Sequence, residues 1–273
     1  MTDLASRTIA FYGVGAMGSA ILAALVRGGH PADQVLAVDT SSERLSELAG
    51  SYAVRTTSDV AEAAGAADVH VVAVKPADVP ALLDAMAGGL GEGDVVVSVA
   101  AGVTSAAIEE HLPDSIAVAR VMPNTPALVG QGMAVVSPGS RCGDEALALA
   151  RAVLEPSGAV LSLPEKHLDA VTGVSGSGPA YVFYLAEAMT EGGVLMGLPR
   201  DVASTLAVQT LLGAATMLAE GDDSATILRE RVSSPGGTTT AGLAVLDERA
   251  TRAAVVAAVR AATERSAELG RGH

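Results

Sequence analysis

The segment from residue 8 to residue 39 constrains the fold of this chain more than any other. A short β-branched and aromatic run, residues 8–12, leads into Gly13-Val14-Gly15-Ala16-Met17-Gly18, and a helical pattern with apolar residues on one face follows. A second apolar run, residues 35–38, ends at Asp39. Strand, Gly-x-Gly-x-x-Gly turn, helix, strand and acid, in this order, predict a β-α-β unit that binds a dinucleotide.

Apolar runs alternate with helical patterns up to about residue 162. Alternation of this kind predicts a doubly wound parallel sheet, whose buried strands read as continuous apolar runs. Lys75-Pro76 follows one of these strands, at the end where such sheets bind ligands. We predict an N-terminal Rossmann domain over residues 1–162, with further strands at 69–74, 95–99, 116–121, 133–136 and 159–161, and helices at 79–86, 104–110 and 144–154.

From Pro164 onward the pattern is helical only. Two central helices carry apolar residues on several faces, which implies burial against more than one neighbour. A domain of about 110 residues has little surface of its own to cover both, so a subunit interface is favoured over a self-contained bundle. The fold class is therefore α/β, followed by an all-helical dimerisation domain over residues 163–273, with helices at 165–172, 179–196, 199–220, 224–231, 238–246 and 251–269.

Residues 232–239 read Val-Ser-Ser-Pro-Gly-Gly-Thr-Thr. A proline-fixed entry followed by two glycines lets consecutive backbone N–H groups converge on one anion, with Ser and Thr hydroxyls as further donors. The alternative is an ordinary helix cap, since Ser, Gly and Thr before an apolar run also begin helices.

The composition of the chain limits its possible partners, its cysteine chemistry and its location. The formal charge of −14 argues against nucleic acid or an anionic membrane surface as partner. The single Cys142 excludes a disulfide framework and a multi-cysteine metal site, and it fits a reducing compartment. We find no apolar stretch of signal-peptide or membrane-span length, so a cytoplasmic location without membrane contact is expected.

The helical half also lacks certain reactive groups. Residues 168–272 contain no His, Cys or Lys, so this half cannot supply a histidine base, a Schiff-base lysine or a soft metal ligand. The groups that remain suit hydride transfer to an electrophilic C=N bond. The substrate would be anchored by its own carboxylate group, and no metal is needed.

The chain resembles pyrroline-5-carboxylate reductases along essentially its whole length. The resemblance implies reduction of 1-pyrroline-5-carboxylate to L-proline by NAD(P)H, the last step of proline biosynthesis, in a homodimer or a higher assembly of dimers. It is carried by Gly13 to Gly18, Ala73-Val74-Lys75-Pro76, Ala100-Ala101-Gly102-Val103, Met122-Pro123-Asn124-Thr125-Pro126 with Gly130, Gly173 to Tyr181, and Ser233 to Thr239.

Site residues follow from the resemblance position by position. Thr239 is implied to lie nearest the ring nitrogen and is the catalytic candidate, while Glu165 and Arg231 are implied to flank the substrate. The substrate carboxylate is implied to bind Ser234, Gly236, Gly237, Thr238 and Thr239. The cofactor set comprises Gly13, Val14, Gly15, Ala16, Met17, Gly18, Asp39, Thr40, Ser41, Val74, Lys75, Pro76, Ala100, Ala101, Gly102 and Asn124.

The cofactor itself is left open by two departures from relatives. Many relatives place an arginine-containing turn where this chain has Asp39-Thr40-Ser41-Ser42, and Val60 replaces a frequent Asn. A carboxylate favours a free 2′-hydroxyl, so NADH is expected; NADPH stays open if the turn from Thr40 to Arg44 forms a phosphate nest.

Two other functions remain as alternatives. A β-hydroxyacid dehydrogenase would share the glycine turn and a helical second domain, but its chemistry needs a lysine in that domain, and the chain has only Lys75 and Lys166. A nucleotide-binding sensor without turnover would not need the loop at residues 232–239.

We interpret Gly176-Ser177-Gly178-Pro179 as architectural, a helix break followed by a helix start.

Overall fold

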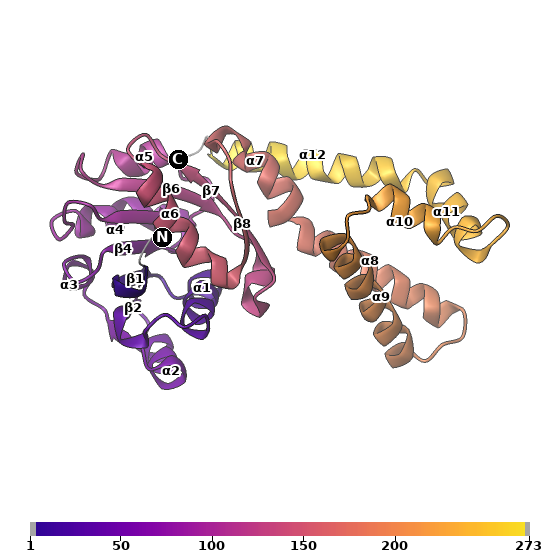
Figure 1. Ribbon diagram of the computed structural model, residues 1–273, viewed down its shortest axis with the longest axis horizontal. Helices are drawn as coiled ribbons and strands as arrows, with labels where there is room; N and C mark the ends of the chain where they lie inside the picture. The colour runs from indigo at the N-terminus through magenta and orange to yellow at the C-terminus, as the bar shows by residue number, and fades with distance from the viewer. Residues whose placement is uncertain (1–3, 271–273) are drawn as a thin grey trace. The chain divides into compact units, whose positions relative to one another are not determined.

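The computed structural model describes residues 4–270 (Figure 1). The chain forms two compact units. Unit 1 comprises Met1–Gly176 together with Ala261–His273, and unit 2 comprises Ser177–Arg260. Each unit is described by itself below.

Unit 1 contains one eight-stranded sheet. The strand order is β3 (Arg55–Thr57), β2 (Val35–Val38), β1 (Ile9–Tyr12), β4 (Val69–Val72), β5 (Val95–Ser98), β6 (Ala117–Met122), β7 (Gly132–Pro138) and β8 (Gly158–Ser162). All neighbouring strands are parallel except β6 and β7. The predicted α/β class is confirmed, but the expectation of a parallel sheet is corrected at β7 and β8, which run opposite to the other six strands. The link between β6 and β7 holds only a 3-10 turn, Thr125–Val129, and a parallel pair would need a longer crossover.

Helices cover both faces of this sheet, as the doubly wound pattern predicts (Figure 1). On one face α1 (Ala16–Arg27), α2 (Ser42–Tyr52) and α6 (Asp144–Leu154) bury Leu, Ile and Val side chains in one core. On the other face α3 (Val60–Ala64), α4 (Val79–Met86) and α5 (Ser105–Glu109) build a second core. β3, α2 and α3 were not among the predicted elements. β3 reads Arg-Thr-Thr and lies at the sheet edge, so it has no apolar run to reveal it.

The segment after the sheet is more irregular than the single helix predicted at residues 165–172. It consists of a 3-10 turn, Glu165–His167, then α7 (Leu168–Val171), then a π-helical turn, Thr172–Gly176. Gly176 allows a close approach, because a Cβ there would lie 2.6 Å from the Cε of Met122.

Unit 2 is helical, as predicted. It contains α8 (Gly178–Leu195), α9 (Arg200–Glu220), α10 (Ala225–Arg231), α11 (Thr238–Glu248) and the first part of α12 (Thr251–Gly270). α8 and α9 form a hairpin whose turn contains Gly197 with a φ of +97°. Small residues bring the two helices together, since a Cβ on Gly193 would lie only 2.9 Å from the Cβ of Ala203.

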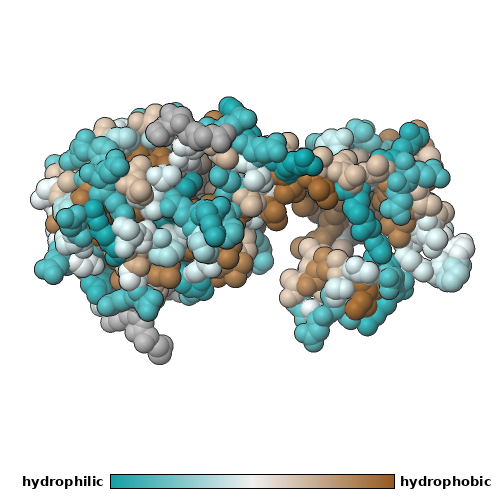
Figure 2. All heavy atoms as spheres, turned by 90° about the horizontal axis from the view of Figure 1, so that it is seen from above, coloured by the Kyte–Doolittle hydropathy of each residue, from teal (hydrophilic) through white to brown (hydrophobic). Residues whose placement is uncertain are grey.

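Many large apolar side chains of unit 2 are not covered within the chain. Leu195 is 80% exposed, Met196 76% and Leu212 59%, and Figure 2 shows apolar residues at the surface of this helical part. Among the described residues, α9 alone has the length and composition of a membrane-spanning helix, a property that core helices of soluble proteins share. Ser, Thr and Gln interrupt it, so α9 is not the unbroken apolar run considered in the sequence analysis.

Candidate active site

The predicted cofactor residues gather along one edge of the sheet in unit 1. The parallel strands end side by side, since Tyr12 pairs with Val38 and with Val72, and Val72 pairs with Ser98. The loops that follow these ends carry Gly13 to Gly18, Asp39 to Ser41, Val74 to Pro76, Ala100 to Gly102 and Asn124. Ligands of doubly wound sheets bind at this edge.

The three glycines of the turn have different physical roles. Gly13 has a φ of +87°, and a Cβ there would lie 2.9 Å from the carbonyl of Ala73. A Cβ on Gly18 would lie 2.1 Å from the carbonyl oxygen of Gly13, so α1 packs directly on the turn. Around Gly15, by contrast, a Cβ would meet no protein atom within 4 Å. The fold explains the first two glycines, whereas Gly15 leaves open the space that a pyrophosphate needs.

The start of α1 faces this open space with uncapped N–H groups. Its N-cap residue is Gly15, and no side chain caps the helix. The first turn of a helix carries unsatisfied N–H groups and the positive end of the helix dipole. The residues of this turn therefore fit the pyrophosphate of a dinucleotide.

Asp39 joins the end of β2 to the glycine turn. Its Oδ2 accepts from the backbone N–H of Val14 at 2.9 Å, and its Oδ1 accepts from that of Ser41 at 2.9 Å. The guanidinium of Arg44 lies 3.7 Å from Oδ2 and is 57% exposed. A cleft of about 430 Å³ borders the glycine turn and is lined in part by Arg44. A carboxylate and a cation are thus both present where a ribose 2′-substituent would be recognised.

The other cofactor candidates differ in their surroundings. Asn124 is buried, and its side chain is used within the protein: Oδ1 accepts from Met133 N–H at 2.8 Å and Nδ2 donates to the carbonyl of Ser175 at 3.1 Å. Lys75 is exposed and precedes the 3-10 turn Pro76–Asp78. Gly102 has a φ of +80°, which favours glycine in the loop between β5 and α5.

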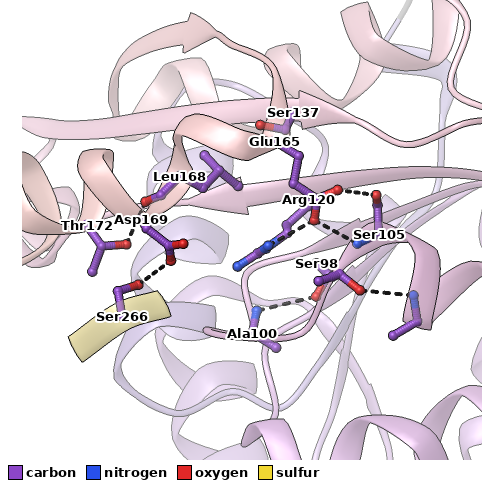
Figure 3. A network of polar contacts seen from close by, with 12 residues as sticks. Ser98, Ala100, Ser105, Arg120, Ser137, Glu165, Leu168, Asp169, Thr172 and Ser266 are labelled. Carbon is purple, nitrogen blue, oxygen red and sulfur yellow. Dashed lines mark hydrogen bonds and ion pairs between the residues drawn. The ribbon is translucent and has the colours of Figure 1, made fainter. Parts of the chain in front are cut away.

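Glu165 is the centre of a polar network in unit 1 (Figure 3). Its carboxylate accepts from the Ser105 hydroxyl at 2.5 Å, from the Ser105 N–H at 2.9 Å and from the Arg120 guanidinium at 2.9 Å. Burial by itself raises the pKa of Glu165, but the hydrogen bonds from Ser105 and Arg120 outweigh it and lower the pKa below its ordinary value. The carboxylate is therefore ionised and holds the start of α5. Ser105 and Arg120 were not among the predicted site residues, because nothing local in the sequence links them to Glu165.

The loop at residues 233–239 lies in unit 2 and ends at the start of α11. The N-cap residue of α11 is Gly237, and no side chain caps this helix. Gly237 N–H and the Thr240 hydroxyl both donate to the carbonyl of Ser234, at 3.0 and 2.7 Å, and so close the loop. Gly236 has a φ of +71°, with no atom within 4 Å of a Cβ position. The hydroxyls thus do not cap the helix, and no side chain accepts from the first backbone N–H groups of α11.

Near this loop, one residue was not predicted, and one predicted residue forms an ion pair within the protein. Thr240, which closes the loop, was not among the predicted residues, although it continues the run of threonines. Arg231 forms a two-pronged ion pair with Asp223, with Nη2 3.1 Å from Oδ1. Thr239 is half-buried, whereas Ser234 and Thr238 are exposed.

Other titratable groups have structural partners. His70, fully buried, lies between the hydroxyl of Tyr12 at 3.1 Å and the carboxylate of Asp94 at 3.3 Å. Burial and the charge of Glu109 raise the pKa of Cys142 to about 11, so its thiol stays protonated and unreactive. Within residues 4–270 no group of three or more His, Cys, Asp or Glu side chains is arranged to hold a metal ion.

Two family descriptions match the chain. Residues 165–269 match the family described as pyrroline-5-carboxylate reductase dimerisation. Residues 8–102 match the family described as NADP oxidoreductase, coenzyme F420-dependent.

Individual relatives cover nearly the whole chain. A pyrroline-5-carboxylate reductase of Synechocystis is 43% identical over 260 residues, which are 95% of this chain and 97% of the relative. The structure of a pyrroline-5-carboxylate reductase from Coxiella burnetii superposes with a TM-score of 0.93 at 33% identity, covering 97% of this chain and 98% of that one. A pyrroline carboxylate reductase from Plasmodium falciparum, solved with NADP bound, gives a TM-score of 0.86 at 28% identity over 97% and 98% of the two chains.

Proposed function

The chain belongs to the pyrroline-5-carboxylate reductase family, and we propose from this membership how its residues share the reaction. It is an oxidoreductase that reduces 1-pyrroline-5-carboxylate to proline with a nicotinamide cofactor, a step of proline biosynthesis. The alternatives, a β-hydroxyacid dehydrogenase and a sensor without turnover, are not favoured by these relatives. The observation that carries the assignment is the identity to reductases along nearly the full chain.

The sheet edge of unit 1 is proposed to hold the cofactor. The N–H groups at the start of α1 and the open face of Gly15 receive the pyrophosphate. Val74 to Pro76, Ala100 to Gly102 and Asn124 line the nicotinamide end. When bound, the reduced nicotinamide supplies the hydride.

The loop of unit 2 is proposed to hold the substrate. Ser234 and the N–H groups of Gly236 to Thr239 bind the carboxylate, since no side chain caps α11. The Thr239 hydroxyl bonds the ring nitrogen. The hydride adds to the carbon of the protonated C=N bond, and the electron pair of the π bond goes to nitrogen, which becomes a neutral amine. Glu165 and Arg231 are proposed to flank the substrate, and no metal takes part.

For the cofactor, we propose a preference for NADH, with NADPH as the alternative. The side chain of Asp39 is 9% exposed and lies beside the glycine turn, where a carboxylate accepts from a free ribose hydroxyl and repels a phosphate. Arg44 supports the alternative, because its exposed guanidinium lies next to Asp39.

The match of residues 165–269 to a dimerisation family implies an oligomer, and we propose a homodimer or an assembly of dimers. The exposed Leu195, Met196 and Leu212 of unit 2 support this, because a partner subunit would cover them. We further propose that residues 1–162 act as the dinucleotide-binding domain, that residues 163–273 act in substrate binding and dimerisation, and that the enzyme works in the cytoplasm.

The test is oxidation of NADH and of NADPH that depends on pyrroline-5-carboxylate, with and without a metal chelator. We expect turnover that the chelator leaves unchanged. Thr239→Ala should lower kcat/KM by about one to two decades, the value of one hydrogen bond to a charged ligand, and leave the nucleotide Kd unchanged. Thr216→Ala, which removes a hydroxyl bonded only within α9, is the matched control.

Each negative result has a distinct meaning. A rate that requires divalent metal contradicts the mechanism. Full activity of Thr239→Ala removes Thr239 from the ring nitrogen and leaves the reductase assignment intact.

A further inference from the structure

The C-terminal end of α12 belongs to unit 1 rather than to the rest of the helical part. Residues 261–270 cluster with the sheet, although α12 begins at Thr251 in unit 2. Along this end, the half-buried residues recur at spacings of one and three positions and lie on one helical face, while the residues between them are exposed. The half-buried residues are Ala262, Thr263, Ser266, Ala267 and Gly270.

Two contacts hold this face in place. The Ser266 hydroxyl donates to Oδ1 of Asp169, in α7, at 2.7 Å (Figure 3). At the last residue of α12, the backbone lies against the loop between β5 and α5, because a Cβ on Gly102 would lie 3.6 Å from the Cα of Gly270. A Cβ on Gly270 would likewise lie 3.6 Å from the carbonyl oxygen of Gly102, so the two glycine backbones lie beside one another with space for a Cβ between them.

The same loop is held at its other end by the Glu165 network. Glu165 binds the N–H and hydroxyl of Ser105, the first residue of α5. Glu165 and Asp169 lie four residues apart in the segment that leads through α7. One short segment thus fixes the start of α5 through Glu165 and the end of α12 through Asp169. The loop from Ala100 to Gly102 directly precedes Ser105, and at Gly102 it lies beside Gly270 at the end of α12.

We propose that residues Ser266 to Gly270, here called the C-terminal brace, position the Ala100–Gly102 loop against the nicotinamide end of the cofactor. Ser266 is then a positioning residue that acts through Asp169 and the backbone of Gly102. The inference rests on the proposed function, which assigns Ala100 to Gly102 to the nicotinamide. Small errors in the placement of reacting groups lower hydride transfer steeply, so a contact outside the reacting groups can control the rate.

The test compares ligands with and without nicotinamide on the full-length protein. Ser266→Ala removes the contact to Asp169, Ser266→Thr retains a hydroxyl, and Glu264→Ala, at an exposed position of the same helix outside the brace, is the matched control. Kd is measured for the reduced dinucleotide from its own fluorescence and for ADP-ribose by calorimetry, with the 2′-phosphate form if NADPH is preferred. kcat and the KM for pyrroline-5-carboxylate are measured in parallel.

We expect Ser266→Ala to raise the Kd of the reduced dinucleotide about two- to tenfold, the range that the loss of one hydrogen bond gives, and to lower kcat. The Kd of ADP-ribose and the KM for pyrroline-5-carboxylate should not change, and Ser266→Thr should restore the wild-type values. Gly270→Leu, which enlarges the residue packed on Gly102 without removing the Ser266 contact, should give the same selective loss and serves if Ser266→Ala does not fold.

The brace is refuted if both variants bind the reduced dinucleotide as tightly as wild type. It is also refuted if the Kd values of the reduced dinucleotide and of ADP-ribose rise equally, because an equal rise indicates general destabilisation of the protein. A wild-type protein inactive on pyrroline-5-carboxylate would overturn the proposed reaction. The two dissociation constants would still test the brace.

Discussion

Replacing Glu165 by Gln tests whether its ionised carboxylate stabilises unit 1. Gln has nearly the same shape and keeps one acceptor oxygen, but it loses the charge that attracts Arg120 and shortens the bonds from Ser105. Each charge-assisted bond contributes roughly 1.5–3 kcal/mol. The side chains of Glu165 and Arg120 are 26% and 13% exposed, so the cost should stay below that of breaking a fully buried pair. We expect Glu165→Gln to lower the free energy of unfolding by about 2 kcal/mol at neutral pH.

The cost of this substitution should depend on pH in one direction. In the folded protein the pKa of Glu165 lies below its ordinary value of 4.5. A carboxyl group with a lowered pKa contributes its full stability above the unfolded value and loses it as the pH falls through the folded value. The difference in unfolding free energy between wild type and variant should therefore be full at neutral pH and shrink as the pH drops below 4.5.

Urea unfolding at one fixed protein concentration, at neutral pH and below pH 4.5, measures this difference. Glu155→Gln is the control, because Glu155 pairs with Arg151 only at the surface, at 3.7 Å, and should cost less than about 0.5 kcal/mol. The reasoning is refuted if Glu165→Gln costs no more than Glu155→Gln, or if its cost is the same at both pH values.

Three further substitutions probe the other assignments. Gly15→Ala should change the free energy of unfolding by no more than about 1 kcal/mol. It should raise the Kd of the dinucleotide about tenfold or more, since its methyl group enters the pyrophosphate space. An unchanged Kd in calorimetry would contradict this. Asp39→Ser should shift the ratio of catalytic efficiencies toward NADPH, and a strong NADPH preference in the native enzyme would move the phosphate site to the turn that contains Arg44. Leu212→Asp, 59% exposed in the single chain, should dissociate the oligomer in sedimentation, whereas Leu161→Asp, 55% exposed in unit 1, should not; a monomeric, fully active native protein would exclude the shared interface.

Local pattern was sufficient for most elements of this fold. β2, α4 and α6 match their predicted bounds, because apolar runs and helical apolar patterns mark strands and helices without reference to distant residues. The reversal of β7 was not visible in this way, since an antiparallel strand in a mostly parallel sheet carries the same apolar residues. What decides its direction is the shortness of the preceding link.

In the candidate site, too, the parts that are contiguous in sequence were predictable and the contacts between distant residues were not. The glycine turn and the Ser234 to Thr239 loop are contiguous in sequence, and both were predicted residue by residue. Their assigned roles stay predictions. The contacts of Glu165 with Ser105 and Arg120, at separations of 60 and 45 residues, have no local signature. Only the folded chain shows which hydroxyl and which guanidinium Glu165 binds.

The contact between Ser266 and Asp169, across 97 residues, also sets when this protein can finish folding during synthesis. The ribosome releases the chain from its N-terminus, so all eight strands emerge before the stretch Ser177–Arg260 and the last turns of α12 follow. At about 5–20 residues per second, that stretch takes on the order of ten seconds to translate. For that interval the surfaces around Asp169 and Gly102 are uncovered, and unit 1 is completed only after the last turns of α12 have been synthesised.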